Sequence, residues 1–409
     1  MTTFPLPLVD LLGQNGAFFI YFLVGISFGA VLETAGFGNS KKLAAQFYLK
    51  DLTVFKVMFT AIIVAMTLIF LSSAIGLLDF NLLWVPPTYL WPGIAGGLVM
   101  GVGFIIGGFC PGTSLVAMAT GKIDGVFFVL GVLAGIFLFG ETVSNFAVFF
   151  ESSFMGRFTL PELFGLDYGV VVLGVVLMAL FMFWGAEKIE AAMGGETAQK
   201  APRRAVPMAT ALVALAVVGL VIGQPDNDRR WQMIEAEQGA LVEQRTVQIE
   251  PAELLSLMHD SMIKVVMIDV RDERHYNQFH FHDAELVSMD DLVEESARLM
   301  QEPANTVFIT MSNDEGRATE AWKVLRAESL PNVYILEGGV NNWIRTYSDE
   351  AFVRDRYVMN RADDEPAFRF ELAIGSRHPA AEPVLHSEVE FEPKVKLELK
   401  RAPTGGGCG

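Results

Sequence analysis

The sequence predicts a multi-span α-helical membrane domain followed by a soluble α/β domain. Residues 1–223 contain long apolar runs and hold only 10 Lys and Arg with 12 Asp and Glu, whereas residues 224–409 hold 20 and 35. In the second part, short β-branched segments alternate with amphipathic helices, a pattern typical of a parallel sheet covered on both faces. The chain therefore joins an apolar half to an acidic half of net charge −15, a balance that excludes a basic surface for nucleic acid.

The apolar half contains six stretches that approach the ~20 residues needed to cross a bilayer. They lie at about 16–37, 55–78, 93–121, 123–149, 167–186 and 205–223. Any one of them could be the core helix of a soluble protein. Six in succession indicate an integral protein embedded in the lipid bilayer.

The positions of the basic residues predict the orientation of these spans. Basic residues follow the first, third and fifth spans: Lys41, Lys42, Lys50, Lys122, Lys188, Lys200, Arg203 and Arg204. The intervening loops carry Arg157 alone. Because cytoplasmic loops are rich in Lys and Arg, we expect these odd-numbered loops to face the cytoplasm and the N-terminus to face out, in a multi-pass protein of the bacterial inner membrane. An even number of spans then places residues 224–409 in the periplasm, on the same side as the N-terminus.

Two segments of the apolar half look like copies of each other. GISFGAVLETAGFGNSKK (25–42) aligns with GVGFIIGGFCPGTSLV (101–116), with Gly38 opposite Gly112. Each segment has small residues, then a glycine-rich break, then a short polar helix start. Pro111 suits the first position of a new helix, with Thr113 and Ser114 in its opening turn. A helix that begins inside the membrane offers free N–H groups to an anion, whereas simple glycine-mediated helix packing is the alternative.

The runs FYLKDLTVFKVMFTAI, PPTYLWPGIAGGLVMGVGFIIGGFCPGTS and GKIDGVFFVLGVLAGIFLFGE resemble the YeeE/YedE family of thiosulfate and sulfur-compound transporters over roughly residues 20–185. The resemblance implies that Cys110 contacts the sulfane sulfur of thiosulfate during passage. Gly36 stands where the family often has another Cys. A pathway with one Cys, or a homo-oligomer that supplies two, is therefore implied.

Acidic residues in or near the spans add to this candidate site. Burying the ionisable side chain of Glu33 or Glu141 in a membrane costs free energy, and such groups are usually functional. Either residue could carry a coupling proton. The alternative is an interfacial carboxylate that pairs with Lys42 or lies in water. The expected substrate-binding and transport residues are Cys110, Pro111, Gly112, Thr113, Ser114, Gly36, Gly38, Glu33 and Glu141. We expect no metal and no cofactor.

The acidic half begins with a linker at 224–245 and continues as an α/β domain at 246–350. Its signature elements are Asp269-Val270-Arg271, Tyr276, His280, Glu337-Gly338-Gly339 and Trp343. These elements resemble the rhodanese family over residues 246–347. The resemblance implies a parallel sheet with a catalytic loop after one of its strands.

The sequence of that loop argues against catalysis. Active rhodaneses carry a Cys five residues before an Arg, and the thiolate takes up sulfane sulfur as a persulfide. In VFITMSNDEGR, counting back from Arg317 gives Ser312, which cannot hold a persulfide. Asp269, Arg271, Ser312 and Arg317 therefore form a degenerate loop. We expect this domain to capture or relay sulfur without sulfurtransferase activity of its own.

Residues 351–409 form a tail in which EVEFEPKVKLELK alternates like an edge strand. The tail ends in TGGGCG, so Cys408 lies on a flexible arm and is a candidate sulfur carrier or an incidental thiol. The whole sequence predicts a transporter for thiosulfate or a related small sulfur anion, with a sulfur-carrier protein as a further partner. A membrane-anchored sulfurtransferase or sulfur sensor is the alternative, which six spans do not favour because an anchor needs only one.

Overall fold

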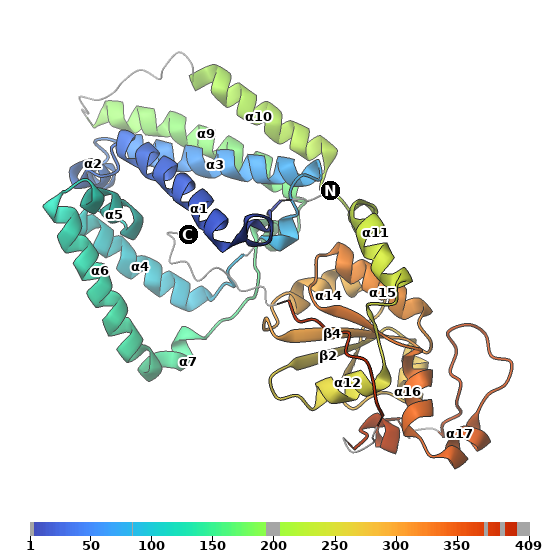
Figure 1. Cartoon of the computed structure of the whole chain (residues 1–409). Coiled ribbons are helices and arrows are strands. Elements are labelled where there is room, and N and C mark those ends of the chain that lie inside the picture. Colours follow the sequence, from blue (N-terminus) through green and yellow to red (C-terminus); the bar gives the residue numbers. More distant parts are fainter. Residues whose placement is uncertain (1–3, 84, 194–204, 372–374, 385–388, 399–409) are drawn as a thin grey trace. The chain divides into compact units, whose positions relative to one another are not determined.

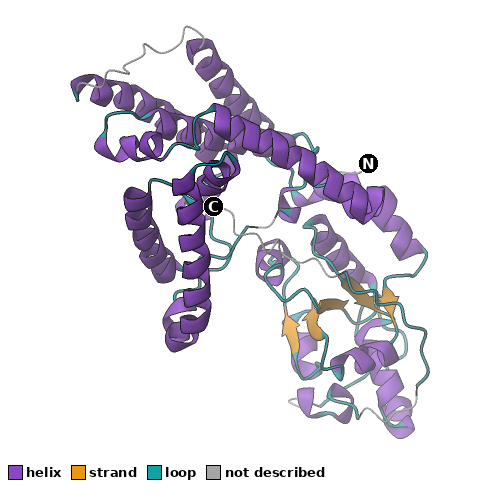
Figure 2. Cartoon of the chain, turned by 60° about the vertical axis from the view of Figure 1, so that its left-hand side comes forward, coloured by secondary structure: helices purple, strands orange, loops and turns teal. Residues whose placement is uncertain are grey.

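The computed structural model describes residues 4–83, 85–193, 205–371, 375–384 and 389–398. The chain divides into two compact units between Gln224 and Pro225. We call residues 4–224 the membrane unit and residues 225–398 the sheet unit. Figure 1 labels their elements, and Figure 2 shows helices in both units and the strands of the sheet unit.

The membrane unit consists of helices joined by short turns. They are α1 (Leu8–Thr34), α2 (Ser40–Ala45), α3 (Thr53–Ala74), α4 (Leu90–Gly107), α5 (Pro111–Ala119), α6 (Ile123–Thr142), α7 (Ala147–Phe150), α8 (Leu160–Phe164), α9 (Tyr168–Ala192) and α10 (Ala205–Ile222). Large apolar side chains cover much of the outside, such as Ile106, which is 83% exposed. An apolar exterior of this kind is what lipid would contact.

Several of these helices are long and apolar enough to span a membrane. Among the described residues there are five such spans, at Leu11–Thr34, Thr53–Ala74, Leu90–Ala119, Ile123–Phe150 and Tyr168–Ala192. A sixth is reached when α10 is counted together with the following helix α11 (Asn227–Glu243). The predicted multi-span helical domain is thus confirmed, with five or six spans.

Three of the spans pack together through small and β-branched residues. α3, α9 and α10 share a core of Ile63, Val172, Val176, Ala179 and Ala216. At Gly169 a Cβ atom would lie 2.8 Å from the Cα of Leu220. This contact lets α9 and α10 approach closely, as small residues do in membrane helix pairs.

The sheet unit contains one five-stranded parallel sheet. Its strands are β1 (Gln248–Ile249), β2 (Lys264–Asp269), β3 (Ala284–Leu286), β4 (Thr306–Met311) and β5 (Val333–Leu336), in the order β1-β5-β4-β2-β3. The helices are α11, α12 (Pro251–Met258), α13 (Glu273–Gln278), α14 (Leu292–Leu299), α15 (Gly316–Ala327), α16 (Gly339–Tyr347) and α17 (Glu350–Arg356). All pairings are parallel, which confirms the predicted α/β class.

Helices cover both faces of the sheet. α11, α14 and α15 lie on one side, and α12 and α16 lie on the other (Figure 1). The core includes Trp322 and Trp343, both at most 1% exposed. Residues that were expected to be a linker thus include α11, whose Trp231 ring contacts that of Trp322.

Residues after position 350 also belong to the sheet unit. Ala367, Phe368, Ala380 and Ala381 are buried in the same core as the strands. Further on, residues 393–398 run extended, without strand pairing, and Glu253 accepts hydrogen bonds from the backbone N–H groups of Lys394 and Val395. The expectation of an edge strand here is wrong, because side chains rather than a backbone ladder hold this segment.

Candidate functional site

Two helix breaks in the membrane unit have the same construction. α1 ends just before Gly36, whose φ is 82°, and α4 ends at Gly107, just before Gly108, whose φ is 69°. Such left-handed backbone is easy only for glycine. A buried Phe follows each glycine, Phe37 in the first break and Phe109 in the second. The two Phe side chains belong to one apolar cluster, so the breaks lie together.

The new helices begin at corresponding N-cap residues. Asn39 caps α2 through its side-chain oxygen, and Cys110 caps α5 through its sulfur. The left-handed glycines therefore pair Gly36 with Gly108, and the caps pair Asn39 with Cys110. The sequence alignment, which places Gly36 opposite Cys110, differs from this register by two residues at the glycines and by three at the caps. The first break also has one more residue, Gly38, between its glycine and its cap.

Cys110 is held at the start of α5 by a reciprocal capping box. The N–H of Thr113 donates to the Cys110 sulfur at 3.4 Å, and the Cys110 N–H donates to the Thr113 hydroxyl at 3.0 Å. Pro111 occupies the first helical position, as predicted, and the Ser114 hydroxyl donates to its carbonyl. Thr113 and Ser114 are buried, whereas Cys110 is only half-buried. The structure therefore brings Cys110, Pro111, Gly112, Thr113 and Ser114 together around an accessible sulfur.

The depth of the sulfur follows from helix geometry. α5 has nine residues and leads to the turn at Lys122, so Cys110 lies about 13 Å from that turn along the helix axis. α5 packs alongside α6. The amino end of α5 is therefore the end of this helix that lies away from Lys122, and Gly108 just before it packs against Ser40.

Polar contacts join the first break to the turn between α5 and α6 and to the start of α6. Lys122 Nζ lies 3.3 Å from Glu33 Oε1, and the Ser40 hydroxyl donates to Asp124 Oδ2 at 3.0 Å. Lys42 instead donates to the carbonyl of Ala35. The alternative that Glu33 pairs with Lys42 is therefore wrong, because Lys122 takes that place.

Glu33 lies directly beside Gly38. A Cβ atom on Gly38 would lie 2.4 Å from Glu33 Oε2 and 2.8 Å from Lys122 Nζ. Glu33 Oε2 is buried and has no hydrogen-bond partner among the described residues. Glu141 is exposed and lies about 26 Å along α6 from Asp124, so the structure does not bring it to the breaks.

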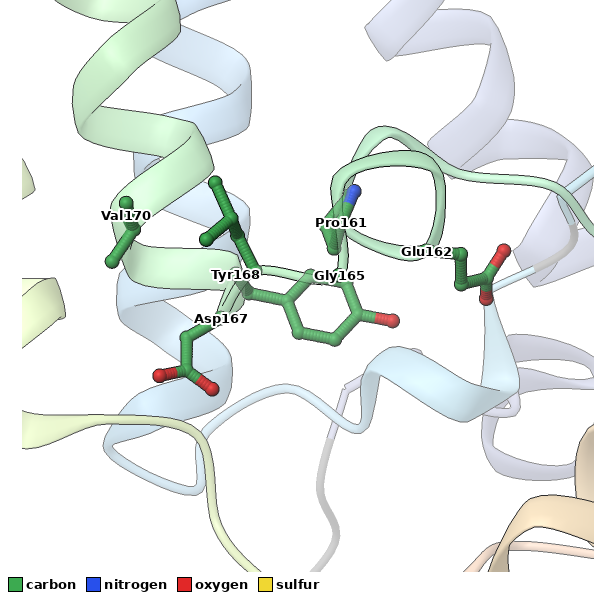
Figure 3. A pocket seen from close by; sticks show the side chains of 7 residues that line it. Pro161, Glu162, Gly165, Asp167, Tyr168 and Val170 are labelled. Atoms are coloured by element: carbon green, nitrogen blue, oxygen red, sulfur yellow. The ribbon is translucent and has the colours of Figure 1, made fainter.

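A shallow hollow lies at the amino end of α9, lined by Pro161, Glu162, Gly165, Leu166, Asp167, Tyr168 and Val170 (Figure 3). The Glu162 carboxylate accepts the N–H of Thr159 and so caps α8. The acidic groups Glu162 and Asp167 make this hollow unsuitable for an anion. It also lies about 33 Å along α9 from Glu190, which pairs with Lys56 at the opposite end.

In the sheet unit, the predicted loop residues lie at the carboxyl ends of β2 and β4. Asp269 and Arg271 form a buried ion pair, and Arg271 also donates to the carbonyl of Phe279. Arg317 pairs with Asp272, and this contact lowers the pKa of the Asp272 carboxyl. Ser312 follows β4 directly and is 0% exposed.

The Ser312 hydroxyl is engaged within its own loop. It accepts the N–H of Ala318 at 3.1 Å and donates to the carbonyl of Asp314 at 3.3 Å. Gly339 closes the loop from α16, since a Cβ there would lie 1.9 Å from the Asp314 carbonyl oxygen. Cys408 lies outside the described residues. Among the described residues, no cluster of three or more His, Cys, Asp or Glu side chains could hold a metal ion.

Comparisons with known proteins agree with both units. The model of the sulphur transport family matches residues 34–233, and that of the rhodanese-like domain matches residues 250–346. This chain joins a member of the sulphur transport family to a rhodanese-like domain. It is accordingly a multi-pass membrane transporter for a small sulfur-containing anion.

Among solved structures, the chain is similar to a rhodanese-like domain of an Anabaena protein determined by NMR in solution. The identity is 21%, with 31% of this chain and 94% of that chain covered and a TM-score of 0.23. No curated protein matches the chain.

Sequence reasoning did not single out four polar residues of the sulphur transport domain: Asn39, Ser40, Lys122 and Asp124. Asn-Ser ahead of two lysines is a recognisable helix-start signal and would have identified Asn39 as a cap. The contacts of Lys122 and Asp124 join residues more than 80 positions apart, so no local pattern encodes them.

Proposed function

We propose that the sulphur transport domain carries thiosulfate, or a closely related anion with a terminal sulfur, past Cys110. The observation that supports this most is the sulfur atom at the amino end of α5. Ser, Thr, Asn and Asp cap helices best, and a Cys at this position gives up part of the roughly 1 kcal/mol of a good cap. A residue that caps poorly and is only partly buried is well suited to contact a soft ligand through its sulfur.

The chemistry of the break fits such a cargo. A helix amino end presents N–H groups and a partial positive charge, which favour the dianion. The Cys110 thiol offers a weak S–H donor and a polarizable sulfur to the terminal sulfur of thiosulfate. Passage by this route needs contact only, without transfer of the sulfur atom to the protein.

Glu33 is proposed as the group that carries a coupling proton. Its contact with Lys122 links the first break to the turn between α5 and α6, and its second oxygen is buried beside Gly38. Ionisable side chains in membrane-spanning helices are rare and mark proton and ion pathways in transporters. Protonation would also free Lys122 to attract the incoming anion. Glu141 lacks this surrounding and is the less suitable candidate.

The chain is proposed to lie in the inner membrane of a bacterium, with the rhodanese-like domain in the periplasm. The ion pairs Lys56–Glu190 and Lys122–Glu33 both lie at the lysine-bearing end of the helices. Basic residues gathered at one end support a cytoplasmic location for that end. In the periplasm, the rhodanese-like domain would bind or relay sulfur ahead of transport. Cys408 is a candidate carrier, because Ser312 precludes a persulfide in the loop.

Assembly of two chains is also proposed. The second break has Cys110, whereas its counterpart in the first break is Asn39, so one chain offers a single thiol among its described helix starts. A homo-oligomer would bring two Cys110 thiols to one pathway.

Uptake into proteoliposomes tests the proposed cargo. The full chain is reconstituted, and entry of radiolabelled thiosulfate is compared with entry of radiolabelled sulfate, which has the charge but no terminal sulfur. We expect thiosulfate uptake well above that of empty liposomes and at least tenfold above sulfate. Equal uptake of both anions would remove the sulfur contact from the proposal, and no uptake of either would remove thiosulfate as the cargo.

A further inference from the structure

The loop after β4 in the rhodanese-like domain is covered by a segment from further along the chain. We call residues 361–365 the cover segment. The N–H of Asp314, within the loop, donates to Asp364 Oδ1 at 2.7 Å, and the N–H of Asp364 donates back to Asp314 Oδ2 at 3.2 Å. Asn313 Nδ2 donates to the carbonyl of Asp364 at 2.7 Å. The loop and the cover segment thus bind each other through backbone and side chain.

Further contacts fix the two ends of the cover segment. Arg361 holds both carboxylate oxygens of Asp314, at 2.5 and 2.7 Å, and also donates to the carbonyl of Glu365. At the other end, Asn341 Nδ2 donates to the Glu365 carbonyl, and the Glu365 carboxylate lies 3.4 Å from His275 Nε2. The first end of the cover segment is therefore bound to the loop, and the second end is bound to α16 and α13.

Asp364 adopts an unfavourable conformation to make these contacts. Its φ is 56°, in the left-handed region that costs a non-glycine residue energy. Its Oδ2 atom is buried and has no hydrogen-bond partner among the described residues. Such a residue persists only where its surroundings hold it firmly.

We propose that Asp364 is an internal carboxylate ligand that keeps this loop closed. In an active rhodanese, the loop N–H groups face the anionic sulfur species, and here one of them is taken by the Asp364 carboxylate. The loop then lacks a thiol and is also closed by the cover segment. A thiol placed at position 312 is therefore inaccessible to reagents in solution. This closure is a property of the rhodanese-like domain and does not depend on the cargo of the transporter.

The reactivity of a cysteine at position 312 tests the closure. The full chain in detergent carries Cys110→Ser, Cys408→Ser and Ser312→Cys, so that position 312 holds its one thiol, and alkylation by iodoacetamide is followed over time. With the cover segment intact, we expect alkylation at least 100-fold slower than in the same protein unfolded in guanidinium. Alkylation within tenfold of the unfolded rate would overturn the proposal.

Two glycine substitutions separate the carboxylate from general loosening of the segment. Asp364→Gly removes the ligand and suits the left-handed backbone, and we expect it to speed alkylation at least tenfold. Asp363→Gly loosens the exposed neighbour and is expected to stay within twofold of the parent. Equal rates in the two variants would refute a role for the Asp364 carboxylate.

Two more variants keep the test decisive if Asp364→Gly disturbs the fold. Near-ultraviolet circular dichroism of the buried Trp322 and Trp343 reports folding in each case. Asp364→Asn keeps an acceptor for the Asp314 N–H and is expected to stay within threefold of the parent. Arg361→Ala leaves Asp364 in place but frees Asp314, and is expected to speed alkylation at least fivefold in a folded protein. No change in folded Arg361→Ala would count against the closure.

Discussion

At the scale of single residues, Cys110 of the membrane unit and Ser312 of the sheet unit differ in burial and in hydrogen bonding. In the sulphur transport domain, the Cys110 sulfur makes a weak helix cap, and the residue is only partly buried. In the rhodanese-like domain, Ser312 has both its donor and its acceptor engaged and is fully buried. Of these two side chains, Cys110 is therefore the one that we propose meets the sulfur compound.

Asp314 gives a pH-dependent prediction at the residue scale. Partial burial acts to raise the pKa of its carboxyl, but hydrogen bonds from Arg361 and Asn341 outweigh burial and leave the pKa below its ordinary value. The folded state then binds fewer protons at this group than the unfolded state. Its stabilisation is full above about pH 4 and is lost as the pH falls through the lowered pKa.

We therefore expect Asp314→Asn to lower the free energy of unfolding of the rhodanese-like domain by about 1 kcal/mol at pH 7. The difference from the unsubstituted protein should shrink as the pH falls below about 4. Urea unfolding followed by Trp fluorescence at several pH values measures both quantities. A difference that stays constant down to pH 3 would contradict the role given to Arg361.

At the scale of elements, the two breaks pack against each other, with Gly108 against Ser40, and the first break also contacts the start of α6. Glu33 at the end of α1 meets Lys122 before α6, and Ser40 of α2 meets Asp124 of α6. Phe37 and Phe109 pack into the same cluster between them. A change at one break is therefore expected to be felt at the other.

The proposed coupling proton is tested by comparing two carboxylates. Glu33→Gln removes the titratable group beside Lys122, and we expect thiosulfate uptake to lose its response to an imposed pH gradient and to fall at least tenfold. Glu141→Gln is the matched control, since Glu141 is exposed at the far end of α6. Uptake by Glu33→Gln that still follows the gradient, with loss in Glu141→Gln, would reverse the assignment.

Local patterns predict the elements better than their contacts. The start of α5 at Pro111 follows from its Pro, Thr and Ser, because these residues determine helix starts over a few positions. The strands follow from β-branched runs between amphipathic helices. The extended course of residues 393–398 is not predicted correctly, because its alternation satisfies side-chain contacts with Glu253 and Tyr334 instead of a ladder.

The site is predictable to the same degree. The motif around Cys110 is evident in the sequence, since its residues are consecutive. Its relation to the first break is not evident, because the sequence alignment lies two to three residues away from the structural register and only the left-handed glycines reveal the match. The cover segment over Ser312 lies about 50 residues downstream of it and has no local signature.

At the scale of the whole molecule, the chain combines a transporter with a rhodanese-like domain. Five or six spans are more than an anchor needs, so the membrane part has its own task. The side on which the rhodanese-like domain lies determines whether it meets sulfur before or after transport.

Labelling of Cys408 tests that side. A membrane-impermeant maleimide is applied to intact spheroplasts after mild reduction, with Cys110→Ser and Cys408→Ser variants to assign each signal. We expect Cys408 to label without lysis, because the proposed orientation, with the basic loops in the cytoplasm, has residues 224–409 on the periplasmic side. Cys110 should label slowly or not at all. Labelling of Cys408 only after lysis would place the domain in the cytoplasm and reduce the spans to an odd number.

The central claim is that the sulfur of Cys110 is needed for the cargo to pass, and Cys110→Ser tests it most directly. Serine caps a helix at least as well as cysteine, so folding and membrane insertion should be retained while the soft sulfur contact is lost. Cys110→Ala, which lacks both the cap and the sulfur, serves for comparison. In proteoliposomes loaded with equal amounts of protein, we expect both variants to take up radiolabelled thiosulfate no faster than empty liposomes. Uptake by Cys110→Ser within about twofold of the unsubstituted protein would contradict the claim.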